Sequence, residues 1–288
     1  MSSAREITTR AITDGVAGTL YLVSTPIGNL GDMTFRAVEV LSSVALIVAE
    51  DTRHSRRLLD HFRVSTPVSS YHEHNEAKET PRLIARLQAG ESIALISDAG
   101  TPLVSDPGSR LTRAAIDAGI KVVPVPGASS VMAALVASGL PLERFSFFGF
   151  LPRKGAERAA AVGDLVASQV TTVVFEAANR VSATLEDLVE AGAGERVAIV
   201  ARELTKQFEE FRRGTVAELA HFYRDSEPRG EVVLLISGVE PRDASEDDLN
   251  AAAQKLRASG KQPREVMQHL ISTLGASRNV AYRIAHSG

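Results

Sequence analysis

Short apolar runs alternate with amphipathic stretches along most of the chain. Residues 44–49 and 93–96 contain no polar side chain, which is typical of short strands buried on both faces of a parallel sheet. Between such runs, apolar residues recur three or four positions apart, as on one face of a helix. Strands and helices therefore alternate, and this order predicts an α/β fold. Similar runs predict further strands at 18–24, 121–125, 145–150, 171–176, 196–201 and 231–237.

Changes in composition divide the chain into four segments. Residues 1–17 lack a hydrophobic signal core and are expected to be a flexible lead-in. Residues 18–140 hold four strand–helix units and are predicted to form an N-terminal α/β domain. Residues 141–240 are predicted to form a second α/β domain with its own core. Residues 241–288 are expected to form three short helices with helix-turn-helix proportions, which serve either as a packing appendage or as a nucleic-acid contact.

Several helix starts are marked by residues that favour the N-cap position. Ser, Thr and Asp side chains accept hydrogen bonds from the first free N–H groups of a helix. The Thr-x-x-Glu pattern at 215–218 is a capping box, and Pro263 suits the first turn of a helix. The expected N-caps are Asp32, Asp51 or Thr52, Thr80, Asp106, Ser129 or Ser130, Thr215 and Ser245.

Composition narrows the class of protein. The chain is 44% hydrophobic and 23% charged and has no cysteine, which excludes disulfides and thiolate metal sites. No apolar run approaches the roughly 18–20 residues of a membrane span, so we expect a cytoplasmic enzyme that does not enter a membrane. The net charge of −3 is unlike that of proteins that bind bare nucleic acid without specificity. Any RNA substrate would be bound through local basic patches or as a folded, partly protein-coated particle.

The loop after the strand at 93–96 is the first candidate for a ligand site. It reads S-D-A-G-T-P-L-V-S-D-P-G over residues 97–108. Loops at the carboxyl ends of buried parallel strands are where open α/β sheets bind ligands, and Asp98 lies at the start of this loop. Asp98 would alternatively be a capping residue in an ordinary turn.

A second candidate loop follows the first strand, at residues 25–32, with the sequence T-P-I-G-N-L-G-D. A loop between a first strand and a helix favours an anion or nucleotide site at the helix N-terminus. The chain contains neither GxGxxG nor GxxxxGK[ST], which argues against Rossmann dehydrogenases and P-loop NTPases.

Charged residues cluster after the strand at 44–49. Glu50 and Asp51 are adjacent, and three arginines with a histidine follow by residue 57. One interpretation is a helix start with solvated arginines. The other is a substrate rim, where arginines contact phosphates and a carboxylate orients a hydroxyl. Nearby, His72 and His74 have no clear third ligand, so we expect no metal and place them at the substrate or the surface.

Seven motifs together carry a resemblance to a known family. The sequence is similar to the tetrapyrrole-methylase (class III methyltransferase) fold family, and within it to the small-subunit ribosomal RNA methyltransferases. The similarity runs in order from about residue 18 to residue 237, and the C-terminal helices resemble the family's helix-turn-helix module. The motifs are L-Y-L-V-S-T-P-I-G-N-L-G-D (20–32), A-E-D-T-R-H (49–54), Y-H-E-H-N-E (71–76), the 97–108 loop, P-G-A-S-S (126–130), G-F-L-P-R-K (149–154) and A-R-E-L-T-K (201–206).

The resemblance implies a fold, a cofactor and a reaction. The fold would be two α/β domains with S-adenosyl-L-methionine as methyl donor between them. The methyl group would pass to the 2′-oxygen of a cytidine ribose in the decoding region of small-subunit ribosomal RNA, and the protein would be a homodimer. The implied donor-binding residues are Ile27, Asp98, Gly100, Thr101, Ala128, Ser129, Ser130, Phe150, Glu176, Ala177, Ala201, Arg202, Glu203, Leu204 and Gly230.

Two departures from the family pattern matter. Residues 175–180 read F-E-A-A-N-R where the family more often has Glu-Ser/Ala-Pro-His-Arg. Pro26 stands where porphyrin-type members have a glycine of their GxGPGD loop, which argues against a tetrapyrrole substrate.

The chemistry of methyl transfer suggests roles for the charged residues. A base within hydrogen-bond reach of a ribose hydroxyl speeds its reaction by about 10²–10⁴-fold. We assign this role to Glu50 or Asp51, with Arg53 nearby, or alternatively to Lys206. Substrate contacts, mostly to phosphate, are expected from Arg56, Arg57, His72, His74, Arg153 and Lys154. The competing functions are a tetrapyrrole C- or N-methyltransferase and a non-catalytic, RNA-binding ribosome assembly factor.

Overall fold

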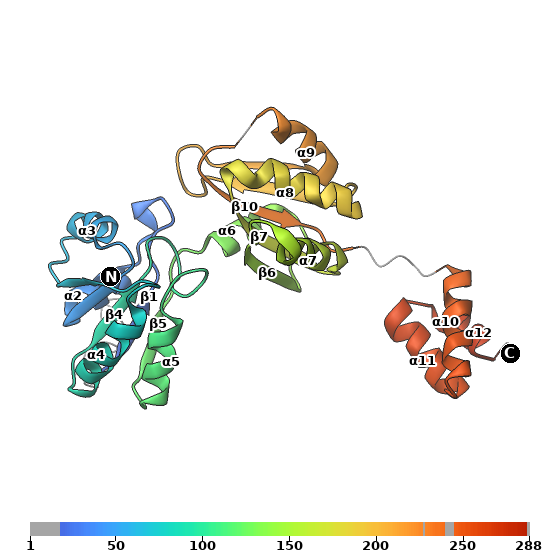
Figure 1. Ribbon diagram of the computed structural model, residues 1–288, viewed down its shortest axis with the longest axis horizontal. Coiled ribbons are helices and arrows are strands. Elements are labelled where there is room, and N and C mark those ends of the chain that lie inside the picture. Colours follow the sequence, from blue (N-terminus) through green and yellow to red (C-terminus); the bar gives the residue numbers. More distant parts are fainter. Residues whose placement is uncertain (1–17, 227, 240–244, 287–288) are drawn as a thin grey trace, which may run out of the picture.

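The computed structural model describes residues 18–226, 228–239 and 245–286. Within them, the chain forms two five-stranded sheets followed by three C-terminal helices (Figure 1). The α/β fold expected from the sequence is confirmed. The lead-in at 1–17 and the junction at 240–244 lie outside the described residues. None of the described helices is long and apolar enough to cross a membrane.

The first sheet is entirely parallel and has the strand order β3-β2-β4-β1-β5. Every residue of β2 and β4 is buried, which agrees with their unbroken apolar sequences. Strand β3 was not predicted, because V-S-S is only three residues long and half-buried at the sheet edge. The strands are β1 (Leu20–Val23), β2 (Leu46–Ala49), β3 (Val68–Ser70), β4 (Ile93–Ile96) and β5 (Val122–Val125).

Helices cover both faces of this sheet, as parallel strands require. On one face, α2 and α3 pack through residues such as Leu41 and Leu59. On the other, α4 and α5 pack through Leu87 and Leu111. The helical segments are η1 (Leu30–Asp32), α2 (Phe35–Ser43), α3 (Thr52–His61), α4 (Glu76–Gln88), α5 (Ser109–Asp117) and α6 (Ser130–Ser138).

The second sheet is mixed, with the order β6-β7-β10-β8-β9 and one parallel pair, β6 with β7. Helices α7, α8 and α9 cover one of its faces. Strand β9 was missed because its sequence E-F-R-R-G-T is charged, as an edge strand allows. The elements are β6 (Phe145–Phe150), α7 (Gly155–Ala167), β7 (Thr171–Ala177), η2 (Ala178–Arg180), α8 (Val181–Leu188), η3 (Val189–Ala193), β8 (Val197–Arg202), β9 (Glu210–Thr215), α9 (Val216–Arg224) and β10 (Glu231–Ile236).

The other face of the second sheet packs against two segments from the N-terminal part of the chain, the loop after β1 and helix α6. Ile27 and three residues of α6, namely Val131, Ala134 and Leu135, share a buried cluster with residues of β7, β8 and β10. Helix α6 therefore joins the two sheets, and in Figure 1 it lies between them. This contact brings the loops at the carboxyl ends of β1, β4 and β5 to the second sheet.

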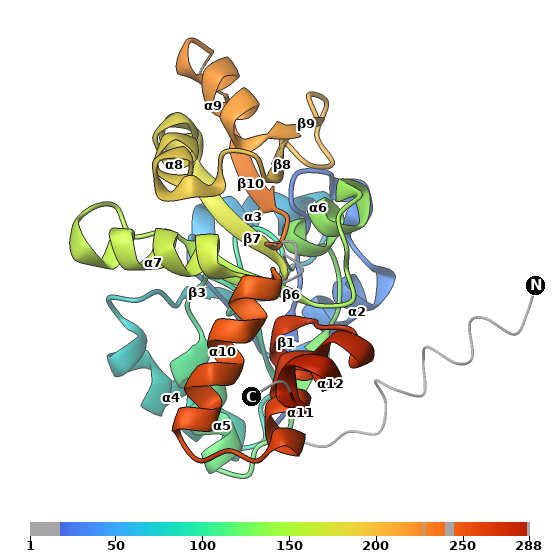
Figure 2. The ribbon, with the colours of Figure 1, turned by 90° about the vertical axis from the view of Figure 1, so that its right-hand side faces the viewer.

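The C-terminal helices form a bundle with a core of their own. Leu249, Val266, Leu270 and Ile284 are buried there. The bundle comprises α10 (Glu246–Ala258), α11 (Pro263–Leu274) and α12 (Arg278–His286), and Figures 1 and 2 show its three helices packed together. The two sheets and the bundle fall inside the ranges expected from composition, while the boundary positions themselves stay predictions.

Most of the expected helix caps are confirmed. The side chains of Asp51, Ser129, Thr215 and Ser245 accept hydrogen bonds from the backbone at the starts of α3, α6, α9 and α10. Pro263 occupies the first turn of α11 as predicted.

Three expected caps are wrong. Asp32 lies in η1, and Thr34 caps α2 instead. Helix α4 begins at Glu76, so Thr80 lies within it and donates its hydroxyl to the Glu76 carbonyl at 2.6 Å. Helix α5 begins after Gly108 rather than after Asp106. Asp106 is thereby free for another role.

Candidate functional site

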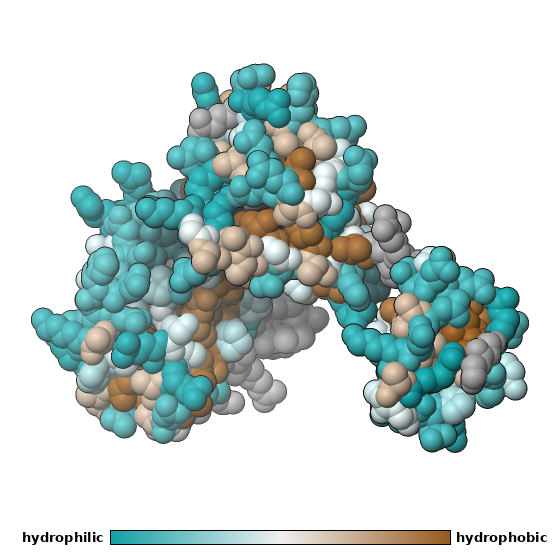
Figure 3. Space-filling model, turned by 45° about the vertical axis from the view of Figure 1, so that its right-hand side comes forward, coloured by the Kyte–Doolittle hydropathy of each residue, from teal (hydrophilic) through white to brown (hydrophobic). Residues whose placement is uncertain are grey.

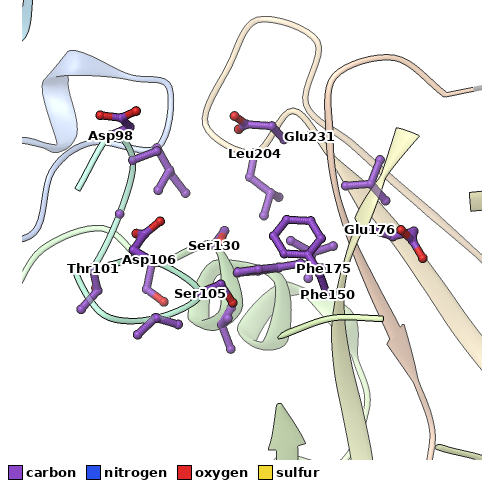
Figure 4. Close-up of a pocket in the computed structure, with 18 of the residues that line it drawn as sticks. Asp98, Thr101, Ser105, Asp106, Ser130, Phe150, Phe175, Glu176, Leu204 and Glu231 are labelled. Carbon is purple, nitrogen blue, oxygen red and sulfur yellow. The ribbon is translucent and has the colours of Figure 1, made fainter. Parts of the chain in front are cut away.

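A cavity of about 530 Å³ lies where the loops of the first sheet meet the second sheet (Figure 4). From the first sheet it is lined by Glu50 after β2, by the 98–106 loop after β4, and by Ser129 and Ser130 after β5. From the second it is lined by the end of β7, by Leu204, and by the start of β10. The cavity is of the size that binds small molecules and cofactors.

The central loop is fixed at its base and reaches into the cavity at its tip. Thr25 and Gly100 exchange two backbone hydrogen bonds, of 2.9 and 3.1 Å. Gly100 has φ +78°, and a Cβ atom there would lie 3.2 Å from Ile27 Cγ2. Beyond it, Leu103 and Ser105 also adopt left-handed φ values of 72° and 65°. Such backbone conformations are costly for residues with side chains and tend to occur at functional sites.

Three carboxylates of the cavity have no cationic partner among its lining residues. Glu50 follows β2, Asp98 and Asp106 lie in the loop after β4, and no Lys or Arg lines the cavity. Burial, together with the charges of Glu50 and Asp98, raises the pKa of Asp106 to about 6. Burial and then the charge of Asp98 also raise the pKa of Glu50. A cavity with this excess of negative charge favours a cationic ligand.

The other two acidic residues at the cavity are already paired. The Glu176 side chain is fully buried, and its carboxylate contacts Arg180 Nε at 3.2 Å and Thr184 Oγ1 at 2.6 Å. Glu231 contacts Lys206 Nζ at 3.1 Å. The unbalanced charge therefore lies on the side of the first sheet.

An apolar wall faces these carboxylates. Figure 4 shows Phe150 and Phe175 on the opposite side of the cavity from Asp98 and Asp106. The two phenylalanine rings lie 5.5 Å apart between centroids, and Leu204 stands beside them. S-adenosyl-L-methionine has an aromatic base together with sulfonium and ammonium charges, so both sides of the cavity fit this expected donor.

Most of the expected donor residues line the cavity. Its lining residues that the sequence indicated are Ile27, Asp98, Gly100, Thr101, Ser129, Ser130, Phe150, Glu176, Ala177, Leu204 and Gly230. Donor binding by these residues stays a prediction, which their common location favours.

The structure places four expected donor residues elsewhere. Ala128 lines a separate, more open hollow beside Thr34 and Pro126. Ala201 is buried in the core of the second sheet. Arg202 forms an ion pair with Glu210 at 2.7 Å. Glu203 accepts a hydrogen bond from Lys206 Nζ at 2.9 Å.

Several lining residues were not expected. The sequence favoured a helix cap at Asp106. Asp106 belongs to the second Ser-Asp pair of the 97–108 motif, and this repeated pair is the sequence signal that could have identified it as a cavity residue. The sequence did not indicate that Phe175, Glu231 and Val233 line the cavity. Their position depends on the antiparallel pairing of β10 with β7, and no local sequence pattern predicts that pairing. The remaining unexpected residues are Ala99, Val104, Ser105, Val131, Ala178 and Val232.

Glu50 is the one proposed base that lines the cavity. Asp51 caps α3 by accepting hydrogen bonds from the N–H groups of Arg53 and His54, which lowers its pKa. Burial alone would lower the pKa of Lys206, but hydrogen bonds to Glu203 and Glu231 leave that pKa raised. Lys206 is therefore protonated and unsuited to accept a proton.

The expected substrate residues lie outside the cavity. The Arg53 side chain is 94% exposed, and Arg57 on the same helix is exposed as well. Arg153 and Lys154 are exposed between β6 and α7. Arg56 and His72 are half-buried, and the rings of His72 and His74 lie 6.0 Å apart. Among the described residues, no three His, Asp or Glu side chains are arranged to hold a metal ion.

Comparison with known proteins gives consistent matches. A family model described as Tetrapyrrole (Corrin/Porphyrin) Methylases matches residues 19–220. A Synechocystis sp. protein named ribosomal RNA small subunit methyltransferase I is 46% identical over 271 residues, which cover 93% of this chain and 97% of that protein. A Mesorhizobium japonicum protein of the same name is 49% identical and covers 83% of this chain and 82% of that protein.

Solved structures share the fold. Uroporphyrin-III C-methyltransferase from Thermus thermophilus has a TM-score of 0.53 and 24% identity, and the match covers 76% of this chain and 94% of that one. A structure of a uroporphyrin-III C-methyltransferase from the same organism, complexed with S-adenosyl homocysteine, has a TM-score of 0.55 and 18% identity, covering 76% and 97% of the two chains. These likenesses support the two-domain class III methyltransferase fold expected from the sequence.

The contact between Gly28 and Lys206 gives a first testable prediction. A Cβ atom on Gly28, which has φ +145°, would lie 2.4 Å from Lys206 Cγ. Gly28→Ala must therefore displace the Lys206 stem from its two carboxylates. A forced side-chain conformation costs about 0.5–1.5 kcal/mol, so we expect the free energy of unfolding, measured by denaturant titration, to fall by at least about that amount. Gly163→Ala, which adds its methyl group in open space, should be no less stable than the unchanged protein; equal unfolding free energies for both variants would contradict the prediction.

The raised pKa of Asp106 gives a second prediction. Its folded value of about 6 exceeds the ordinary value of 3.8, so the folded state holds the proton more tightly. The stability this adds is present below the unfolded pKa and is lost as pH rises through the folded value. The melting temperature of Asp106→Asn, relative to the unchanged protein, should thus rise between about pH 4 and about pH 8. A difference that stays constant with pH would show that Asp106 titrates normally.

Proposed function

We propose a reaction for a chain that belongs to the tetrapyrrole (corrin/porphyrin) methylase family and, within it, to the proteins named ribosomal RNA small subunit methyltransferase I. The chain is an S-adenosyl-L-methionine-dependent methyltransferase. Its substrate is the RNA of the small ribosomal subunit, as the names of its relatives indicate. The observation that carries the proposed mechanism is the cavity with three unpaired carboxylates and an apolar wall.

Residues on both sides of this cavity would hold the donor. Phe150, Phe175 and Leu204 offer an apolar surface to its adenine, while Asp98 and Asp106 lie opposite and favour its cationic groups. When bound, S-adenosyl-L-methionine supplies an activated methyl group on a sulfonium centre. The cavity residues would mainly position the reacting atoms, which is the largest contribution a protein makes to a displacement of this kind.

The acceptor is proposed to be the 2′-oxygen of a cytidine ribose in the decoding region. This finer assignment rests on the resemblance of the seven motifs. Glu50 supports it chemically, because a carboxylate at the cavity is placed to accept the hydroxyl proton as the methyl group is transferred. Its raised pKa brings it closer to the range in which general bases work best.

Cations outside the cavity, most of them exposed, would position the RNA. Arg53, Arg56 and Arg57 lie on α3, which starts beside Glu50, and Arg153 and Lys154 lie in the loop after β6. Arginine and lysine contacts to phosphate fix the register of a nucleic acid without reading its sequence. His72 and His74 are proposed to hydrogen-bond the same substrate. A ribosomal substrate also supports the proposed location of the enzyme in the cytoplasm.

The protein is further proposed to be a homodimer, as the resemblance implies. Helix α6 has the sequence S-V-M-A-A-L-V-A-S and no charged side chain. One side packs on the second sheet, but Met132 and Val136 on another side are 50% and 69% exposed. A helix that is apolar all round is normally buried on all sides, so a second copy of the chain is the proposed cover. Figure 3 shows that hydrophobic residues also reach the surface near the middle of the molecule.

The reaction is tested by transfer of labelled methyl from S-adenosyl-L-methionine to small ribosomal subunits, with extracted ribosomal RNA and a porphyrinogen assayed in parallel. We expect label in the subunit RNA, at a ribose 2′-oxygen. Glu50→Gln should lower turnover by about a hundredfold or more, whereas Asp51→Asn should keep most of it, because Asp51 serves as a helix cap.

Other outcomes of this assay would overturn parts of the proposal. Label only in the porphyrinogen would make the chain a tetrapyrrole methyltransferase. Donor binding without label in any substrate would favour the non-catalytic assembly factor. Loss of turnover in Asp51→Asn but not in Glu50→Gln would move the base to Asp51.

The dimer proposal predicts that Val136→Glu dissociates the protein. A charge in an apolar interface is left without solvent or a partner, which disfavours association. Sedimentation should show a dimer for the unchanged chain and a monomer for the variant. Ile116→Glu, on the exposed side of α5 (58% exposed), is the matched control and should remain dimeric. A monomeric unchanged chain, or a dimer in all three cases, would contradict the use of this face.

A further inference from the structure

The C-terminal bundle carries a charge opposite in sign to that of the rest of the chain. Residues 245–286 contain six Lys or Arg and four Asp or Glu, whereas the whole chain contains 32 and 35. The bundle is therefore positive by two charges, and the remainder is negative by five. Nothing in the reaction at the cavity requires this separation of charge.

Within the bundle the acidic residues lie at the starts of two helices, where Glu246 pairs with Arg283 of α12 at 2.8 Å and Glu265 pairs with Lys261 at 2.9 Å. Three of the four acids, at 246–248, lie in the first turn of α10, and the fourth is Glu265 at the start of α11. No acidic residue occurs after Glu265. Helix α12 is thus the one helix of the bundle that has basic residues and no acidic residue of its own.

Helix α12 has one buried and one exposed side. Ala281, Ile284 and Ala285 pack into the bundle core. Arg278, Tyr282 and His286 are exposed and follow one another at intervals of four residues, so they form a single stripe. Arg278 forms no ion pair within the described part of the chain.

The stripe contains a stacked aromatic pair in contact with solvent. The rings of Tyr282 and His286 lie 4.3 Å apart, with 28° between their planes, and the tyrosine is 58% exposed. Large aromatic side chains are usually buried, and an exposed one beside basic residues is the platform on which proteins stack unpaired RNA bases.

The turn between α11 and α12 is shaped by a left-handed glycine and by a serine that caps α12. Helix α11 ends at Gly275, which has a left-handed φ of 70°, and Ser277 Oγ accepts a hydrogen bond from Val280 N at 3.4 Å. In a helix-turn-helix arrangement the second helix contacts nucleic acid through its N-terminal residues. Arg278 and Asn279 occupy that position and are exposed.

We propose that the exposed face of α12, formed by Arg278, Tyr282 and His286, binds an unpaired segment of small-subunit ribosomal RNA outside the catalytic cavity. Arg278 would contact phosphate, and the Tyr282–His286 pair would stack on a base. The bundle would then hold the substrate while the acidic body positions one nucleotide at the cavity. The inference rests on the proposed function for the identity of the RNA.

Binding of the full-length protein to extracted small-subunit ribosomal RNA, measured by filter binding at several salt concentrations, tests this surface. Tyr282→Ala should weaken binding at least about fivefold, because a stacking contact is lost. Tyr282→Phe keeps the ring and should bind as the unchanged chain does. Arg278→Ala should reduce the slope of log affinity against log salt by about 0.7, the value for one contact to single-stranded RNA.

Two controls separate this surface from general effects. Lys261→Ala removes a cation of the same bundle that is paired with Glu265 at 2.9 Å, and it should change binding less than Arg278→Ala. Affinity for S-adenosyl-L-methionine should be unchanged in every α12 variant, because the cavity contains no residue of the bundle.

The outcomes distinguish this inference from the proposed function. Unchanged RNA affinity in both Tyr282→Ala and Arg278→Ala would overturn the inference while leaving methyl transfer intact. Loss of binding to intact subunits but not to extracted RNA would overturn it in favour of a protein partner. Weakened RNA binding in these variants would support it, even if methyl transfer to the ribose were absent.

Discussion

The packing of α6 and Ile27 against the second sheet is the contact on which the functional site depends. Val131, Ala134 and Leu135 bury one side of α6 against β7, β8 and β10. This burial fixes the distance between the sheets, since close-packed interiors do not deform continuously. The cavity lies at the same junction, where the loops after β2 and β4 face the apolar wall of the second sheet. The residues of both sheets that line the cavity can therefore act together only while this contact holds.

The same junction explains the charge of the cavity. Parallel strands end at one edge, so Glu50 and Asp98 meet there by topology, and the central loop adds Asp106. Placing three carboxylates in a partly buried space without a lysine or arginine costs stability. The raised pKa values of Glu50 and Asp106 are signs of that cost. A positively charged donor would offset this loss of stability. The three carboxylates would therefore destabilise the protein without the donor but stabilise its complex with the donor.

The sequence predicted the parts of this site that depend on local pattern. Buried strands are visible as apolar runs, and the polar residues after them, Glu50 and Asp98, follow directly. Asp106 was assigned to a helix cap because Asp-Pro-Gly fits a helix start, yet the left-handed φ of Gly108 delays the helix to Ser109. Glu231 and Phe175 were missed for a different reason. Their place at the cavity follows from the antiparallel pairing of β10 with β7, which is a long-range property that no local pattern records.

The distribution of charge links the site to a ribosomal substrate. An acidic body with a negative cavity favours a cationic cofactor but repels a polyanion. In the proposed arrangement, RNA would be held by cations that lie apart from the cavity, on α3, in the loop after β6 and on α12. Such contacts would fix the backbone of the RNA while leaving the proposed ribose to enter the cavity. Because each of these basic surfaces is small, stable binding requires several of them to engage at once, which a structured ribosomal particle permits and a short free RNA does not.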